Sequence, residues 1–183
     1  SGLMASKIKV DELETADGSG TIALQNQLSG VTYASMPAGS VLQVQTLSRA
    51  RTATLTSTST SHIVLNDGVD DFELSITPKY TGSTIVGYVS INGVTMLGTG
   101  TSMEICVFRN GSNWKALDSH FGYNSYHYAG HDNFTCHFSE SNVGTTSAVT
   151  YSIRAKTNGQ MRFFDTHISS TIYNHLTLME IKA

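Results

Sequence analysis

The stretch Ala148-Val-Thr-Tyr-Ser-Ile-Arg-Ala155 decides the fold class, because its apolar and polar residues alternate strictly. The residues on the apolar side of the pattern are Val149, Tyr151, Ile153 and Ala155. A period of two predicts a β-strand with one buried face. We expect Met161–Phe164 to return beside it as a partner strand, since the turn Thr157-Asn-Gly159 contains the Asn-Gly pair that favours tight hairpins.

The chain closes with a second informative stretch, Leu176-Thr-Leu-Met-Glu-Ile-Lys-Ala183. In a strand, Leu176 and Leu178 point to one face. Thr177, Met179 and Ile181 point to the other. Large apolar side chains on both faces are atypical of a strand at the edge of a soluble monomer. We therefore predict a strand inside a sheet, with one face on the domain core and the other on a partner subunit.

Short strand-like segments fill the rest of the chain. They are Val41–Leu47, Ile63–Leu65, Phe72–Ile76, Ile85–Ile91, Met103–Phe108 and Trp114–Leu117. Turns are expected at Asn66-Asp-Gly68, Asn92-Gly93 and Asn110-Gly111. The Ser- and Thr-rich stretch 52–61 is predicted to be an exposed β-ribbon, because Thr is β-branched. No stretch of ten or more residues has a helical apolar stripe, so the predicted class is all-β, a β-sandwich or jelly roll.

Composition narrows the function. The chain has 183 residues, of which 39% are hydrophobic and 14% charged, and its net charge is −3. The hydrophobic content is enough for a real core. The absence of a basic face argues against nucleic acid as a partner. Apolar runs are too short to cross a membrane or to form a signal peptide, so we expect neither a membrane nor an export signal.

The N-terminal part differs from the rest. Ser1–Leu3 has the character of an expression remnant, and short alternating pieces follow within residues 7–28, too small to pack alone. We predict that residues 4–37 form an extended lead-in or stalk, which is either loosely ordered or held by other copies of itself. Met36-Pro-Ala-Gly39 is the expected junction, and residues 38–183 form the head domain.

Motifs for catalysis are missing from the sequence. We find no Gly-x-Ser-x-Gly elbow, no His-Glu-x-x-His and no glycine-rich phosphate loop. We therefore predict a protein that is not an enzyme, with no catalytic residue, no metal and no cofactor. Cys106 and Cys136 are predicted to be buried free thiols that behave as small hydrophobes, since two cysteines are too few for a disulfide scaffold.

The segment from His120 to His137 is rich in histidine and tyrosine and is a poor core strand. Its end, with alternating Phe134, Cys136 and Phe138, is expected to re-enter the core. The residues predicted to form a recognition surface are Tyr123, Tyr126, His127, Tyr128 and His131. A surface loop without a partner is the plain alternative. A metal site is disfavoured, because four-residue spacing of histidines needs a helix, although a threefold axis would gather one histidine from each chain.

Several segments in sequence order resemble a module of virion proteins of marine tailed bacteriophages. They are Leu74-Ser-Ile-Thr-Pro78, Ser83-Thr-Ile-Val86, Phe108-Arg-Asn-Gly111, Ala148-Val-Thr-Tyr-Ser152 and Leu176-Thr-Leu-Met-Glu-Ile181. The resemblance covers roughly residues 38 to 183. It implies a jelly-roll head similar to C1q and tumour-necrosis-factor domains, assembled as a homotrimer on a virion.

This resemblance sets the functional expectations. We expect a trimeric tail-fibre or appendage head involved in host-surface recognition, with head decoration or fibre capping as the alternative. Tyr88, Met179 and Ile181 are the expected trimer-interface residues. The expected partners are other copies of the chain, other virion proteins and a host-surface glycan or protein.

Overall fold

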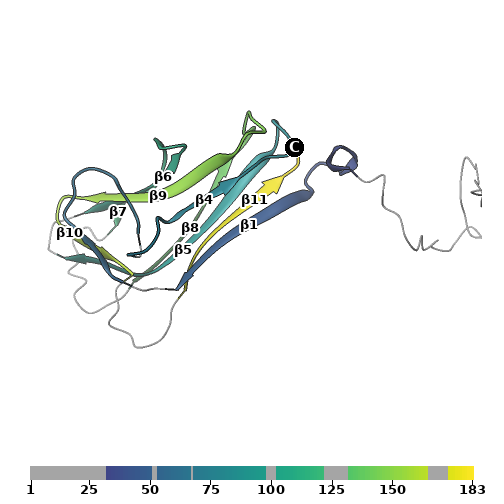
Figure 1. Cartoon of the computed structure of the whole chain (residues 1–183). Helices are drawn as coiled ribbons and strands as arrows, with labels where there is room; N and C mark the ends of the chain where they lie inside the picture. The colour runs from purple at the N-terminus through teal and green to yellow at the C-terminus, as the bar shows by residue number, and fades with distance from the viewer. Residues whose placement is uncertain (1–31, 51–52, 67, 98–101, 122–131, 165–172) are drawn as a thin grey trace, which may run out of the picture. The chain divides into compact units, whose positions relative to one another are not determined.

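The computed structural model describes residues 32–50, 53–66, 68–97, 102–121, 132–164 and 173–183, and its regular secondary structure is almost entirely β-strand (Figure 1). One short 3₁₀ helix, η1 (Tyr33–Ser35), precedes the strands. The strands are β1 (Val41–Ala50), β2 (Leu55–Ser57), β3 (Ile63–Val64), β4 (Glu73–Ile76), β5 (Thr84–Leu97), β6 (Met103–Arg109), β7 (Ser112–Phe121), β8 (Asp132–Glu140), β9 (Val149–Thr157), β10 (Gln160–Phe163) and β11 (Tyr173–Ile181). In the described part of the chain, no helix is long and apolar enough to cross a membrane.

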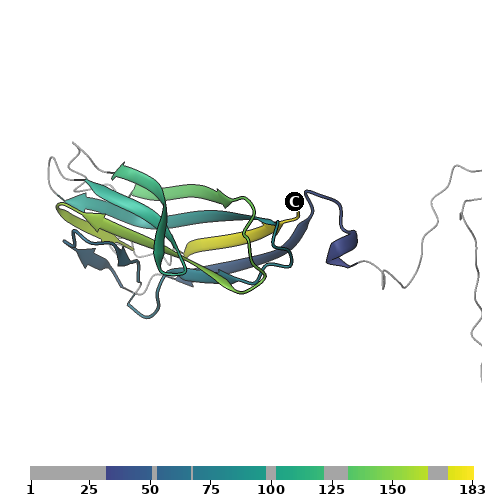
Figure 2. The same cartoon turned by 90° about the horizontal axis from the view of Figure 1, so that it is seen from above.

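Two antiparallel sheets pack face to face, as Figures 1 and 2 show from two directions. In the first sheet β11 lies between β1 and β5, and β8 pairs with the other edge of β5. In the second sheet β9 lies between β6 and the successive strands β3 and β4, and β7 pairs with β6. This order of strands in the two sheets is that of a jelly roll, so the predicted β-sandwich class is confirmed.

The core lies between the two sheets and is built from the predicted alternation. Val149, Tyr151, Ile153 and Ala155 are all buried on β9. Leu176 and Leu178 of β11 are fully buried from the opposite sheet. The rings of Phe138 and Tyr151 lie with their centroids 5.4 Å apart, which joins β8 to β9 across the sandwich. The inward side of the closing strand is therefore as the sequence predicted.

Asn92-Gly93 does not form the expected turn. β5 continues to Leu97, and the pair forms an irregularity in the ladder with β8, where Gly93 has φ 68°. Buried Asn174 of β11 explains the difference, because its side-chain oxygen accepts the Asn92 N–H at 2.8 Å. A bulge of this kind keeps the strand paired while it bends.

The partner of β10 also differs from the prediction. Met161–Phe164 does not pair with β9 as a hairpin; β10 pairs with the far end of β5 and with β2. Thr157 holds the chain at this crossing, because its hydroxyl donates to the Ser102 carbonyl at 3.0 Å and accepts from the Gly159 N–H at 3.0 Å. Neither Asn158 nor Gly159 has the positive φ of a tight hairpin turn.

Other local predictions hold. Asn110 and Gly111, with φ 48° and 81°, connect β6 to β7 in the expected two-residue turn. Phe72 and Ile76 point into the core around β4. β2 supplies an ordered strand inside the Thr-rich stretch 52–61.

The chain divides between Ser35 and Met36 into two units. The second unit carries the sandwich. Most of the predicted lead-in lies outside the described residues, so its role as a stalk stays a prediction.

Two carboxylates tie loops and sheets together: Glu180, which is buried, and Glu140, whose side chain is 13% exposed. Glu180 on β11 accepts hydrogen bonds from the Lys79 N–H at 2.7 Å and from the Ser83 hydroxyl at 2.7 Å. Glu140 on β8 accepts from the Tyr151 hydroxyl at 2.5 Å, and the Arg109 side chain pairs with it at 2.9 Å. Each carboxylate is buried or nearly so and has several donors, the arrangement a buried charge requires.

Candidate functional site

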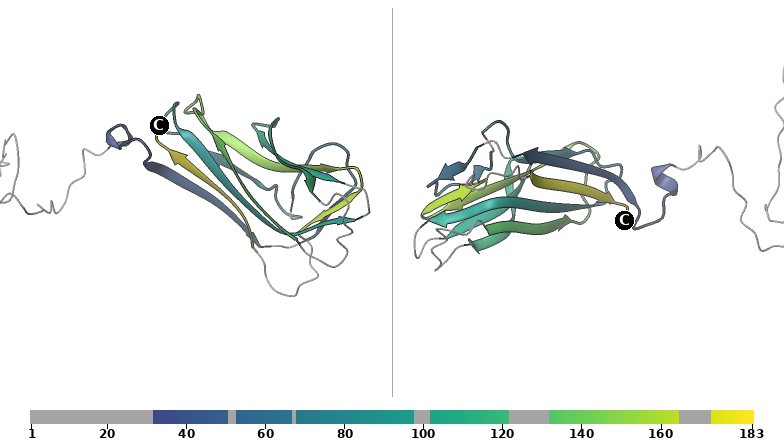
Figure 3. Two further views of the ribbon diagram at one scale, coloured as in Figure 1. Left: turned by 180° about the vertical axis from the view of Figure 1, so that it is seen from behind. Right: turned by 90° about the horizontal axis from the view of Figure 1, so that it is seen from below.

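The outward side of strands β1, β11, β5 and β8, which form one part of the first sheet, is a broad surface that we call the outer face (Figure 3, right). It consists of the residues that alternate with the buried ones on β1, β11, β5 and β8. They are Val41, Val44, Thr46, Ser48, Ala50, Tyr173, His175, Thr177, Met179, Ile181, Thr84, Val86, Tyr88, Ser90, Thr135, His137 and Ser139. None of these positions holds Asp, Glu, Lys or Arg.

Apolar groups are contiguous across the outer face. Met179 sits directly between Val44 on β1 and Val86 on β5. Val44 and Tyr88 are each 50% exposed, although both are large apolar residues. Depletion of charge together with exposed Tyr and Val side chains and a half-buried Met is typical of the centre of a protein–protein interface. An exposed apolar surface of this kind marks an interaction site.

β6 does not contribute to that face. It lies in the opposite sheet, although Cys106 and Phe108 make its second side apolar as well. That side is covered by the chain itself. The Arg154 guanidinium lies 4.3 Å from the centre of the Phe108 ring, and the His62 ring meets Phe108 edge-on at 5.2 Å. Phe108 is 8% exposed as a result.

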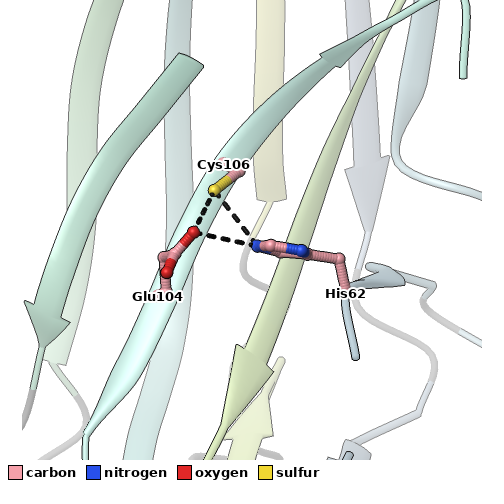
Figure 4. A group of neighbouring side chains, drawn as sticks. All are labelled: His62, Glu104 and Cys106. Atoms are coloured by element: carbon pink, nitrogen blue, oxygen red, sulfur yellow. Dashed lines mark hydrogen bonds and ion pairs between the residues drawn. The ribbon is translucent and has the colours of Figure 1, made fainter. Parts of the chain in front are cut away.

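A second candidate site lies beside Phe108, where three side chains of different chemistry meet (Figure 4). His62 Nε2 is 3.0 Å from Glu104 Oε1 and 3.3 Å from Cys106 Sγ. The thiol of Cys106 donates to the same Glu104 oxygen at 3.0 Å. Lys156 Nζ contacts the other oxygen of Glu104 at 3.0 Å. We call His62, Glu104 and Cys106 the β6 triad.

Contacts within the β6 triad shift the pKa values of Glu104 and Cys106. The hydrogen bond from Cys106 is the main cause that lowers the pKa of Glu104 to about 2, with Lys156 and His62 adding to it. Burial, reinforced by the Glu104 carboxylate, raises the pKa of the Cys106 thiol to about 12. Glu104 is therefore ionised and Cys106 protonated at neutral pH. A thiol in this state is a poor nucleophile.

No protein-family model and no curated protein matches the sequence. Among solved structures, the chain is similar to the crystal structure of the infectious bursal disease virus VP2 subviral particle, with a TM-score of 0.45 and 10% sequence identity. The match covers 78% of this chain and 34% of the VP2 chain, so this chain spans about a third of that protein. A similarity at this TM-score carries no argument about function.

The predicted interface residues Tyr88, Met179 and Ile181 all lie on the outer face, two of them on β11 and one on neighbouring β5. The five predicted recognition residues, Tyr123, Tyr126, His127, Tyr128 and His131, lie outside the described residues, so that prediction stays untested. Phe134 and Phe138 are buried on β8 as predicted, and Cys136 packs partly buried against the core.

Both cysteines are free, as predicted, but Cys106 is more than a small hydrophobe. Its thiol lies in the polar β6 triad, which the sequence did not reveal. The sequence signal for this cluster is weak. Glu104 and Cys106 are two residues apart on one face of a strand, but His62 lies more than forty residues away and is brought to them only by the strand order β3–β9–β6.

Proposed function

We propose that this protein is a structural component of a virion, the trimeric head of a tail fibre or similar appendage. The observation that carries the proposal is the charge-free outer face, which has the composition of a subunit interface. The resemblance of the sequence to bacteriophage virion modules supplies the biological context. Closed symmetry about a threefold axis would bury this face on every chain and leave no open contact for further growth.

A substitution on the outer face tests the assembly. Met179→Glu places a carboxylate among Val44 and Val86, and an unpaired buried charge costs about 3–5 kcal/mol. The affinity of each subunit contact should weaken by roughly two to four orders of magnitude. Thr177→Glu should have a smaller effect, because Thr177 is a smaller and more polar member of the same face.

The matched control is Asn113→Glu on β7, an exposed position on the other sheet. It adds the same charge away from the outer face and should leave assembly unchanged. Circular dichroism of each variant shows whether the sandwich is intact. Equal dissociation by Asn113→Glu and Met179→Glu would reject the outer face as the interface.

Host recognition is the finer part of the proposal and rests on the tyrosine- and histidine-rich stretch. Replacing Tyr126, His127 and Tyr128 together with alanine should abolish binding of the trimer to host cells. Unchanged binding by a trimeric variant would favour the alternative, a head-decoration or fibre-capping protein. Immunogold labelling of intact particles with antibody to this chain distinguishes these positions on the virion.

A further inference from the structure

The β6 triad brings together the three side-chain types that bind zinc most often. Glu104 and Cys106 are two residues apart on β6 and therefore point to the same side of the sheet. His62 immediately precedes β3, and β9 separates β3 from β6. Its ring reaches across β9 to the two β6 side chains, as Figure 4 shows. Imidazole nitrogen, thiol sulfur and carboxylate oxygen thus meet at one point.

The spacing of the three ligand atoms suits one small ion. His62 Nε2, Glu104 Oε1 and Cys106 Sγ are separated by 3.0, 3.0 and 3.3 Å. Tetrahedral zinc with bonds of about 2.0–2.3 Å separates its ligands by about 3.4–3.6 Å. The three atoms need to spread by only a few tenths of an ångström to admit an ion between them.

We propose that the β6 triad is a Zn²⁺ site with three protein ligands and a fourth position open to solvent. The donor set selects the metal, because thiolate and imidazole favour zinc over the oxygen-seeking Mg²⁺ and Ca²⁺. On binding, the S–H bond of Cys106 breaks, its proton passes to solvent and an S–Zn bond forms. The charges of the Cys106 thiolate and the Glu104 carboxylate then balance that of the ion.

The surroundings hold the ligands in place. Lys156 contacts Oε2 of Glu104 and leaves Oε1 facing His62 and Cys106. Phe108 packs against the His62 ring and is itself held under Arg154. Such outer contacts orient metal ligands and are part of a built site.

An entry path is also present. A depression of about 190 Å³ reaches Glu104 from solvent, lined by Thr60, Ser102, Glu104, Lys156, Thr157 and Asn158. Cys106 is fully buried, whereas the side chains of His62 and Glu104 are 15% and 24% exposed. The ion therefore has access from the Glu104 side. The site lies on the sheet opposite the outer face, so the proposal does not depend on the proposed trimer.

The test uses the full chain, treated with chelator and then titrated with zinc chloride by calorimetry. The expected result is one tight zinc per chain, with affinity lowered at least tenfold by Cys106→Ser and by His62→Gln. With cobalt chloride in place of zinc, a thiolate-to-cobalt absorption band should appear in the wild type and be absent in Cys106→Ser. Zinc should raise the unfolding temperature of the wild type and not that of the variants.

Matched controls separate this site from adventitious binding. Cys136→Ser removes the other free thiol, and His137→Gln removes a histidine of the outer face on β8, in the opposite sheet from the triad; both should keep the tight zinc and the cobalt band. If Cys106→Ser fails to fold, His62→Gln decides, because His62 lies outside the core. Wild-type zinc affinity equal to that of His62→Gln, or a cobalt spectrum without a thiolate band, would overturn the proposal and leave the triad as a hydrogen-bonded cluster.

Discussion

Gly87 on β5 is the position where one added methyl group should do most damage. Its register partner is Phe138 on β8, whose ring folds over the glycine. A Cβ at Gly87 would lie 2.1, 2.3 and 2.6 Å from three ring carbons, where about 3.5–4.0 Å is comfortable. The ring has no room to retreat, because Trp114 and Tyr151 pack against it with centroids 5.8 and 5.4 Å away.

Overpacking a core costs about 1–3 kcal/mol, and this overlap belongs at the upper end. For a chain of this length, about 3 kcal/mol lowers the unfolding temperature by roughly 6–12 °C. Urea and thermal unfolding of Gly87→Ala, followed by circular dichroism, measure the loss. Gly82→Ala is the matched control, because a Cβ there meets nothing within 4 Å. Adding Phe138→Leu to Gly87→Ala should recover part of the loss. A Gly87→Ala variant within about 0.5 kcal/mol of wild type would refute the reasoning.

Three further predictions follow from the buried polar groups and the lead-in. Burial and the hydrogen bond to Glu140 raise the pKa of Tyr151, so the unfolded state loses the phenolic proton of Tyr151 at a lower pH than the folded state does. The free energy of unfolding should therefore fall as pH rises above about 10, and Tyr151→Phe should flatten that part of a pH–stability curve. Glu180→Gln should lower the free energy of urea unfolding by about 1–3 kcal/mol, because an amide cannot accept all the hydrogen bonds that Ser83 and its neighbours donate to the carboxylate. An unchanged free energy of unfolding would show that the network is dispensable. Deleting residues 4–34 should leave a folded head, by circular dichroism, that dissociates more readily on dilution; complete unfolding would contradict the two-part organisation.

Local alternation was enough to predict which residues face the core. On β9 the period-two pattern of Val149 to Ala155 has one physical cause, a sheet with one buried side, and the structure follows it. The same logic placed Met179 and Ile181 on the opposite face from Leu176. It worked on β9 because that strand has one clear apolar side, which fixes register strongly.

Pairing between distant strands was not predictable from local patterns. Asn158-Gly159 has the composition of a hairpin turn, but β10 gains its hydrogen bonds from β5 and β2. Asn92-Gly93 has the same composition, yet Asn174, far along the chain, captures its backbone and keeps β5 continuous. In both places a tertiary contact outweighs the local preference for a turn.

The β6 triad was missed for the same reason. A lone histidine at His62 and a lone cysteine at Cys106 carry no spacing signal, since the strand order alone brings them to 3.3 Å. The outer face was partly predictable, because its apolar residues on β11 and β5 stand in the sequence pattern. Its lack of charge became visible only when β1 and β8 joined the same sheet.

The most direct test of the assembly proposal is the mass of the particle that the full chain forms in solution. Light scattering coupled to size-exclusion chromatography at micromolar concentration measures it without a standard of known shape. Burial of the outer face about a threefold axis predicts three times the mass of one chain, returning to the single-chain mass for Met179→Glu. A wild-type protein that elutes as a stable monomer, with the outer face exposed to water, would contradict the proposal.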